Sequence, residues 1–262
     1  MLFLYRHRYL LGQLVRREVV GRYRGSVLGL AWSFLNPLLL LTAYTFVFGL
    51  VFKSSWNVGE KGNMAEFALI VFCGMIPFNL VSETLARAPS LMPANASYVK
   101  KVVFPLEILP LSIMGAALVH ALISMLILIA GVAIVTGKLS PMMLLYPVVL
   151  LPALLLTAGL SWFLASLGVF LRDLQQLVAL LLQLLMFLSP IFYPASRLPA
   201  ALRTVAQLNP MTQVLENGRS VVVFQQMPDW MSWGVWMALG GVVALAGLTW
   251  FNKTRHAFAD VL

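Results

Sequence analysis

Long apolar runs alternate with short polar breaks along most of the 262-residue chain. A helix needs about 20 apolar residues to cross the roughly 30 Å hydrocarbon core of a bilayer. The run at 174–188 is short, with 15 residues and about 22 Å of helix. The pattern predicts an all-α integral membrane protein, one transmembrane domain over 1–262 with six transmembrane helices, at 27–52, 66–86, 106–135, 142–171, 174–188 and 231–251.

Residues 3–23, ahead of the first run, have the pattern of an amphipathic helix. Leu10 and Leu14 fall on one face at helical spacing, whereas Arg16 and Arg17 fall elsewhere. We expect this helix to lie on the membrane. A plain positively charged anchor for the next span also fits, and the two interpretations are compatible.

The region between the fifth and sixth runs is broken by Pro and Asn. Ser189-Pro190 stops the preceding helix, and Asn209-Pro210 separates two short amphipathic pieces at 199–208 and 210–224. Neither piece is long enough to cross. We predict re-entrant outer helices within 194–224, because irregular backbone at membrane depth needs protein or an aqueous cavity around it. A surface loop with two interfacial helices remains open.

Composition supports the bilayer setting and excludes several classes of site. The chain is 61% hydrophobic and 10% charged, with a mean hydropathy of +0.90 and a net charge of +9. Its basic residues cluster beside apolar runs, which indicates topology and anionic headgroups rather than nucleic acid. The one cysteine, Cys73, lies inside an apolar run, so neither a disulfide nor a cysteine metal site is expected, and no other metal site is predicted. Arginines interrupt the first apolar residues, so no signal peptide is predicted.

The distribution of basic residues predicts the orientation. Six spans put both ends on one side, and a cytoplasmic N-terminus places 12 of the 18 Lys and Arg residues inside and 6 outside, as the positive-inside rule requires. Both termini and the loop at 88–104 are then cytoplasmic. The inside set is Arg6, Arg8, Arg16, Arg17, Arg22, Arg24, Arg87, Lys100, Lys101, Arg172, Lys253 and Arg255, and the outside set is Lys53, Lys61, Lys138, Arg197, Arg203 and Arg219.

Ionisable residues inside the runs are few. His120 lies in mid-span and is a functional candidate by position, but no acidic residue accompanies it, so helix packing against a neighbouring carbonyl is the favoured interpretation. Glu83 and Arg87 lie four residues apart and are expected to pair. Pro105 suits the first position of a helix, with Glu107 in its first turn. No catalytic cluster occurs, and the carboxylates avoid the midplane, which argues against an enzyme and an ion-coupled carrier.

Aromatic side chains concentrate in the first run and near the fifth. An interfacial belt and lipid-facing packing explain most of them. Rings that line a conduit without charges would instead suit a large uncharged glycan, because they offer apolar faces to sugar C–H groups without fixing one residue. On that hypothesis the channel-lining set is Trp32, Tyr44, Phe187, Phe192 and Tyr193.

Several short motifs occur in a characteristic order, and together they resemble the membrane subunit of type-2 ABC exporters for cell-surface polysaccharides: O-antigen, capsule and teichoic-acid export permeases. The motifs are Arg22-Tyr23-Arg24-Gly25-Ser26-Val27-Leu28-Gly29 with Trp32 and Asn36-Pro37, Asn95 with Lys100 through Pro110, Arg172-Asp173-Leu174, Ser189 through Pro194, Asn209-Pro210 with Arg219, and Phe258 through Leu262. The order covers nearly the whole chain.

The resemblance implies a homodimer in the bacterial inner membrane, bound to two copies of a cytosolic ATPase subunit. Its substrate would be an undecaprenyl-diphosphate-linked glycan, with O-antigen the leading choice, threaded between subunits along spans one and five. ATP and Mg would be bound by the partner, since no Walker motif occurs here, and no cofactor is expected in this chain. Rival hypotheses are an ABC exporter subunit for a drug or small lipid and, third, a secondary carrier.

The same resemblance suggests roles for individual residues. Arg22, Arg24 and Arg87 would hold the lipid diphosphate through charge-assisted hydrogen bonds. Simple contact with lipid headgroups explains any one of these basic residues equally well. Residues implied in ATPase coupling are Arg16, Arg17, Glu18, Tyr98, Lys100, Lys101, Phe104, Glu107, Arg172 and Asp173.

Overall fold

The computed structural model describes residues 7–47, 64–100, 104–137, 139–195, 198–199, 206 and 208–262. Within these ranges every regular element is a helix and no strand occurs, as predicted for the fold class. In the described part of the chain, four helices are long and apolar enough to cross a membrane. They are α4 (Met64–Arg87), α7 (Ile108–Thr136), η3 with α8 (Pro141–Leu145 and Tyr146–Phe170) and α12 (Trp230–Thr254) with its extension.

Two further apolar helices match the first and fifth predicted spans but are shorter. These are α3 (Trp32–Tyr44), which continues as an apolar helical stretch to Val47, and α9 (Leu174–Leu188). The multi-pass membrane architecture is therefore confirmed, whereas the count of six spans stays a prediction.

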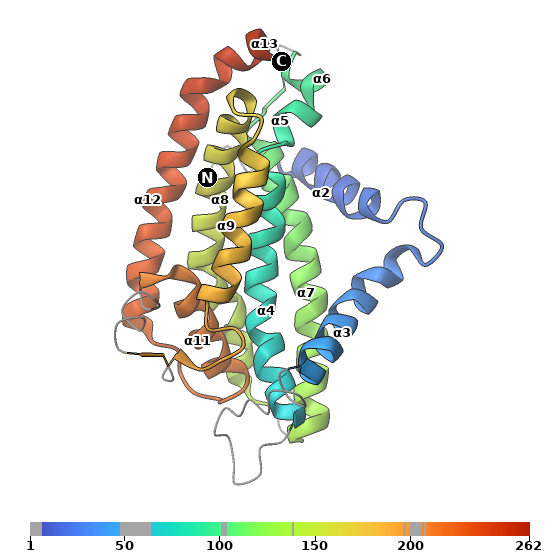
Figure 1. Ribbon diagram of the computed structural model, residues 1–262, viewed down its shortest axis with the longest axis vertical. Helices are drawn as coiled ribbons and strands as arrows, with labels where there is room; N and C mark the ends of the chain where they lie inside the picture. The colour runs from blue at the N-terminus through green and yellow to red at the C-terminus, as the bar shows by residue number, and fades with distance from the viewer. Residues whose placement is uncertain are drawn as a thin grey trace.

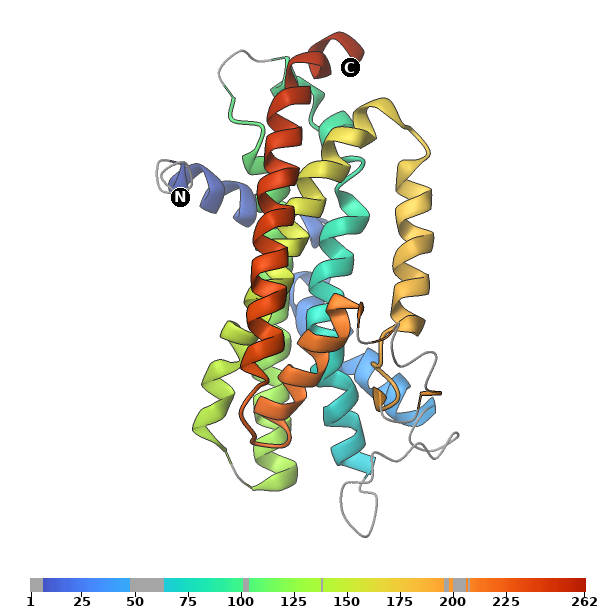
Figure 2. The same ribbon diagram turned by 90° about the vertical axis from the view of Figure 1, so that its left-hand side faces the viewer.

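The long helices stand side by side in one bundle (Figures 1 and 2). Helix α12 packs mainly against α8, and α4 packs mainly against α7. Figure 2 shows α9 standing apart from the bundle, with only Leu174 and Val178 of its side chains buried. The small helices α5 (Leu91–Ala94), α6 (Ala96–Val99) and α13 (Phe258–Val261), the last reached through η5 (Arg255–Ala257), gather at one end, opposite α11 (Pro210–Val222).

Glycine allows α8 and α12 to approach closely. A Cβ at Gly247 would collide with the backbone of Gly159, and one at Gly240 would lie 2.9 Å from the carbonyl oxygen of Pro152. Small residues permit this contact between apolar helices. A Cβ at Gly241 would meet no atom within 4 Å, so this glycine takes no part in the packing, although it is adjacent in sequence.

The N-terminal helix α2 (Arg8–Arg22) lies across the bundle and α3 returns along it, which makes an elbow (Figure 1). Leu14 is buried, and α2 packs against α7. The chain turns through Gly25 at φ 87° and Gly29 at φ 49°, and a 3-10 turn, η1 (Gly29–Ala31), precedes α3. The helix therefore starts at Trp32 rather than at residue 27, because these positive φ values cannot continue an α-helix. Residues 3–6 and 48–52 of the predicted elements lie outside the described residues.

The start of α7 also differs from the prediction for Pro105. The amide of Ile108 donates to the carbonyl oxygen of Pro105 at 3.1 Å, which forms a turn, and the α-helix begins at Ile108 with Glu107 at the N-cap position. Pro105 thus lies before the helix instead of at its first position. The opposite end closes on Gly137 at φ 65°, a left-handed conformation that glycine adopts at little cost.

Helix α11 folds back into the bundle against α4 and α8. Asn209 caps it by accepting from the amide of Met211 at 2.9 Å, and its own side-chain amide donates to Ser189 Oγ at 3.0 Å. Nine of its 13 residues are buried, which favours a packed element over an interfacial helix on a surface loop. Its placement as a re-entrant helix in the bilayer stays a prediction, and most of the piece at 199–208 lies outside the described residues.

Candidate functional site at the elbow and the facing loop

Arg17 joins α2 to the segment that precedes α7, residues 88–104, which we call the facing loop. Its guanidinium donates to the hydroxyl of Tyr98 at 3.1 Å and lies 5.6 Å from the centre of the Tyr98 ring. That ring stacks on Phe104 with centroids 4.6 Å apart and planes at 19°. Three of the predicted coupling residues, far apart in sequence, therefore form one continuous contact.

Glu18 makes a second contact, which joins α2 to α4. Its carboxylate pairs with Arg87 and, at 3.1 Å, with Arg17. The expected pair of Glu83 with Arg87 is wrong, because Arg87 turns to α2 instead. Arg16 and Lys100 lie exposed beside this contact, and Lys101 lies outside the described residues.

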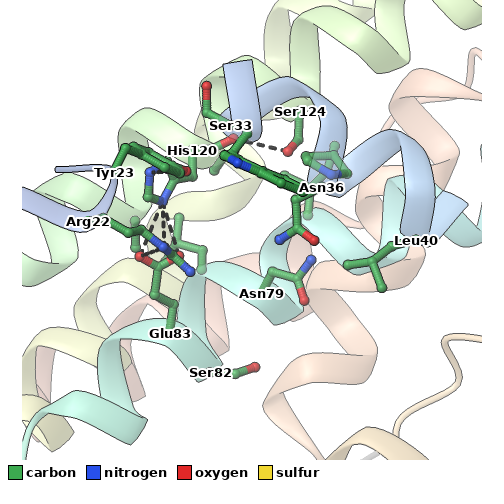
Figure 3. A pocket seen from close by; sticks show the side chains of 16 residues that line it. Arg22, Tyr23, Ser33, Asn36, Leu40, Asn79, Ser82, Glu83, His120 and Ser124 are labelled. Carbon is green, nitrogen blue, oxygen red and sulfur yellow. Dashed lines mark hydrogen bonds and ion pairs between the residues drawn. The ribbon is translucent and has the colours of Figure 1, made fainter. Parts of the chain in front are cut away.

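A polar network fills the inside of the elbow (Figure 3). Arg22 pairs with Glu83, and Nδ1 of His120 lies 3.1 Å from each Glu83 oxygen. The hydroxyl of Tyr23 lies 3.3 Å from Nε2 of the same imidazole. His120 therefore does have an acidic partner, from the neighbouring helix, and the expectation that it packs without one is wrong.

The charges of this network largely cancel. Arg22 is 43% exposed, while Glu83 and His120 are 18% and 14% exposed, so one cation at the rim meets one carboxylate inside. Burial raises the pKa of the Tyr23 phenol above its ordinary value; Arg22 opposes this and Glu83 adds to it, so the group stays a neutral donor. Across the described residues, no group of three or more His, Cys, Asp and Glu side chains could hold a metal ion.

A cavity of about 220 Å³ opens beside the network, between α3, α4 and α7. Figure 3 shows the amide side chains of Asn36 and Asn79 facing one another across it. Ser33, Ser82 and Ser124 contribute to its lining. The network residues Arg22, Glu83 and His120 also line it, and apolar side chains of α3, α4 and α7 complete the wall, so hydroxyl and amide groups stand on a largely apolar surface.

Glu107 joins the start of α7 to the end of the chain. Its carboxylate pairs with Arg255 at 3.0 Å, and its carbonyl accepts from the indole of Trp162 at 2.9 Å. The C-terminal turn is anchored by Phe258, which is fully buried against Phe251. Glu107 therefore links α7, α8 and α12. The other two predicted coupling residues, Arg172 and Asp173, lie exposed in the turn between α8 and α9.

The predicted channel aromatics occupy different environments. Phe187 on α9 is 62% exposed and Trp32 is 39% exposed. Phe192 is 6% exposed and packs on Tyr44 with centroids 5.1 Å apart, and the hydroxyl of Tyr193 donates to the carbonyl of Phe187 at 2.8 Å. The Tyr44–Phe192 contact thus joins the end of α3 to the segment that follows α9, and the lining role of these rings stays a prediction.

Arg219 on α11 is a buried cation, whereas the sequence assigned it to the outside set and to a family motif without predicting its burial. It is fully buried and donates to the carbonyl oxygens of Ile191 at 2.8 Å and Ile70 at 3.3 Å. A Cβ at Gly74 would lie 2.8 Å from Nη2 of this side chain, so the glycine makes room for it. Arg219 therefore holds the segment after α9 to α4. The one feature of the sequence that relates to this buried contact is Gly74 within an apolar run, and a glycine there does not by itself predict a buried arginine.

Comparison with known proteins identifies the relatives of the chain. Residues 9–223 match the family described as ABC-2 type transporter. An O-antigen export system permease protein of Myxococcus xanthus is 32% identical over 261 residues, covering 98% of this chain and 96% of the relative. One from Klebsiella pneumoniae is 26% identical, covering 97% and 95%, and a polysialic acid transport protein of Escherichia coli is 27% identical, covering 93% of each chain.

Proposed function

The chain belongs to the ABC-2 type transporter family as a membrane subunit, and from that premise we propose that it is the permease of an ATP-driven exporter of cell-surface polysaccharide. One observation carries the proposal: the likeness to an O-antigen export permease extends over 98% of this chain, through the elbow, the facing loop and α11. Such a permease is a channel subunit rather than an enzyme, and the nucleotide belongs to a partner ATPase.

The proposed substrate is an undecaprenyl-diphosphate-linked glycan, with O-antigen first and capsule second, moved across the bacterial inner membrane. Among the three arginines expected to hold the diphosphate, Arg22 and Arg87 already face carboxylates. Arg24 is exposed at the elbow and has no ion-pair partner among the described residues. We therefore give Arg24 the leading part in binding the diphosphate, since its charge is not offset.

The proposed assembly is a homodimer with a channel along α3 and α9. Helix α9 supports this, because an apolar helix in a membrane protein with so little of its surface packed leaves room for a partner. Its outward side chains are about half exposed or more, and they include Leu177, Leu184, Phe187 and Leu188. The Tyr44–Phe192 contact would then lie close to the conduit.

Two ATPase subunits are proposed to bind at the end of the bundle where the C-terminal turn and the facing loop lie, beside α2, which we take as cytoplasmic. Their closure would push on α2 and the loop at 88–100. The Arg17–Tyr98 and Glu18–Arg87 contacts would carry that motion into α4, and Glu107 would carry it into α7 and α12. The Glu18–Arg87 and Glu107–Arg255 contacts are ion pairs and Arg17–Tyr98 is a hydrogen bond. All three are partly exposed, so they can exchange partners at modest cost.

Reconstitution tests this function. The chain and its partner ATPase subunit are placed in proteoliposomes with a lipid-linked glycan, and ATP-dependent transfer of the glycan is measured. We expect transfer with both subunits and none with either alone. Arg24→Ala should lower transfer several-fold, while Lys253→Ala, a basic residue near the C-terminus, should not. Transfer of a drug or a small lipid in place of the glycan would support the rival exporter class, and transfer by the chain alone under an ion gradient would support a carrier.

A further inference from the structure

Asn79 is the one exposed position in a long buried stretch of α4. Every other residue from Phe67 to Val81 is buried, so this amide is directed into the cavity at the elbow while its neighbours pack in the core. Asn36 on α3 is likewise exposed and faces it (Figure 3). Neither amide has a hydrogen-bond partner among the described residues. Amides within membrane-spanning helices are costly without a polar partner, so a water or a ligand belongs here.

The chemistry of the cavity favours a neutral ligand. Arg22 and Glu83 form an ion pair, and His120 is held by the same carboxylate, so no unbalanced cation points at the two amides. An amide both donates and accepts hydrogen bonds, as a pair of vicinal hydroxyls does. A diphosphate would need a free cation or several N–H donors instead.

The size of the cavity limits the ligand further. Its volume of about 220 Å³ is many times the roughly 10–15 Å³ that one water needs. Pockets for drug-sized ligands are larger, about 300 Å³ or more. The indole of Trp32, 39% exposed at the edge, offers a flat apolar face of the kind that sugar C–H groups contact. Hydroxyl-binding amides, an aromatic face and this volume together fit one sugar ring.

We propose that the cavity bounded by Asn36, Asn79 and Trp32 is a subsite for a single neutral pyranose of the exported glycan. The inference rests on the proposed function, which supplies the glycan. Arg24 lies in the same elbow, so the sugar held here is the one nearest the lipid diphosphate. The subsite would let the permease test the first sugar at the elbow before the chain enters the conduit.

Thiol protection tests the subsite without transport. Ser82→Cys places a thiol in the lining, while the native Cys73 is buried and unreactive towards maleimide. The complex in proteoliposomes is labelled in the presence of free pyranoses (a hexose, an N-acetylhexosamine and a deoxyhexose), inorganic pyrophosphate or glycerol. We expect at least one pyranose to slow labelling several-fold and to lose this effect when Asn79→Leu is added. Protection by pyrophosphate alone, glycerol protection equal to that of the sugars, or no protection would overturn the proposal.

Saturation by the lipid-linked glycan gives a second readout. Asn36→Leu and Asn79→Leu should each raise the glycan concentration for half-maximal ATPase stimulation about tenfold, the equivalent of one lost hydrogen bond of about 1.4 kcal/mol. Thr42→Val, which removes a polar group from the exposed part of α3 outside the cavity, is the matched control and should leave both the half-saturating glycan concentration and the ATPase activity without glycan unchanged. Unchanged half-saturation in both leucine variants would also refute the subsite. If the unaltered complex moves no glycan, the proposed function fails, and the protection result alone decides the subsite.

Discussion

The close contact of α8 with α12 yields the sharpest prediction for stability. Replacing Gly247 with Ala puts a methyl group into the backbone of Gly159, which cannot rotate away as a side chain would. Overpacking of this kind costs about 1–3 kcal/mol. The gain in helix propensity from Gly to Ala returns about 0.8–1 kcal/mol. Because the added Cβ would lie 2.1 Å from the Gly159 carbonyl oxygen, the upper part of the overpacking range applies, about 2–3 kcal/mol. The net loss is therefore about 1–2 kcal/mol, or about 2–8 °C in melting temperature for a chain of this size.

The chain carries its own control and its own reporter. Gly241 lies on the same helix, where an added Cβ would meet no atom within 4 Å, so Gly241→Ala gains propensity without a collision. Cys73 is buried, and a thiol-reactive dye reports its exposure during a thermal scan in lipid nanodiscs. We expect Gly247→Ala to melt earlier than the parent and Gly241→Ala to melt at the same temperature or later. Equal melting of the two variants would contradict the inferred contact.

Three other predictions concern the site and its supports. Glu18→Gln removes the partner of Arg87, and it should cost at most about 1 kcal/mol of stability because the pair is partly exposed. The amount of glycan moved per ATP hydrolysed should fall several-fold. The control Glu66→Gln, at the far end of α4, should leave this ratio unchanged. Arg219→Met leaves the carbonyls of Ile70 and Ile191 without their donor, and each unpaired carbonyl should cost about 1–3 kcal/mol of stability. Amide hydrogen exchange should become faster at residues 189–194. Unchanged protection there would count against the anchoring role. Asp229 caps α12, and hydrogen bonds from Ser232 hold the pKa of its carboxyl below the ordinary value. The stabilising effect of this carboxylate is therefore present above the unfolded-state pKa of about 3.9 and is lost as the pH falls through the lower folded-state value. Asp229→Ala should cost about 1 kcal/mol at neutral pH, and a thermal scan against pH should show that Asp229→Asn lacks the loss of stability at acid pH.

The ion pairs at the elbow change which of the three arginines we expect to bind the diphosphate. The sequence placed Arg22, Arg24 and Arg87 together as basic residues near the cytoplasmic side. In the structure, two of them are offset by carboxylates that belong to other helices. A paired guanidinium has less to offer a diphosphate, because binding must first break or share the pair. On the proposed function, the elbow is therefore better suited to sugar recognition than three free cations would be, and Arg24 is the arginine that we expect to bind the diphosphate.

Helix positions were largely predictable from the sequence because they depend on local information. The run at 174–188 matches α9 at both ends, and the runs at 66–86 and 231–251 lie within α4 and α12. Apolar length and proline determine such boundaries nearly independently of the rest of the chain. The start of α3 was missed because the positive φ of Gly25 and Gly29 is a property of the turn, which composition alone does not reveal.

Partners across helices could not be predicted in this way. Arg87 lies one turn from Glu83, yet it pairs with Glu18, while Glu83 is taken by Arg22 and His120. Spacing shows which residues share a face of one helix, but the rotation of that helix against its neighbours decides which face meets which.

The sequence by itself thus determined a helical membrane chain, its breaks and the motifs that relate it to polysaccharide permeases. Only the tertiary structure decided that His120 has a carboxylate, that Arg219 is buried and that Gly247, but not Gly241, is a contact. The physical reason is the range of the forces involved. Backbone hydrogen bonds and transfer to the bilayer act along one helix, whereas ion pairing and close packing depend on how several helices are rotated together.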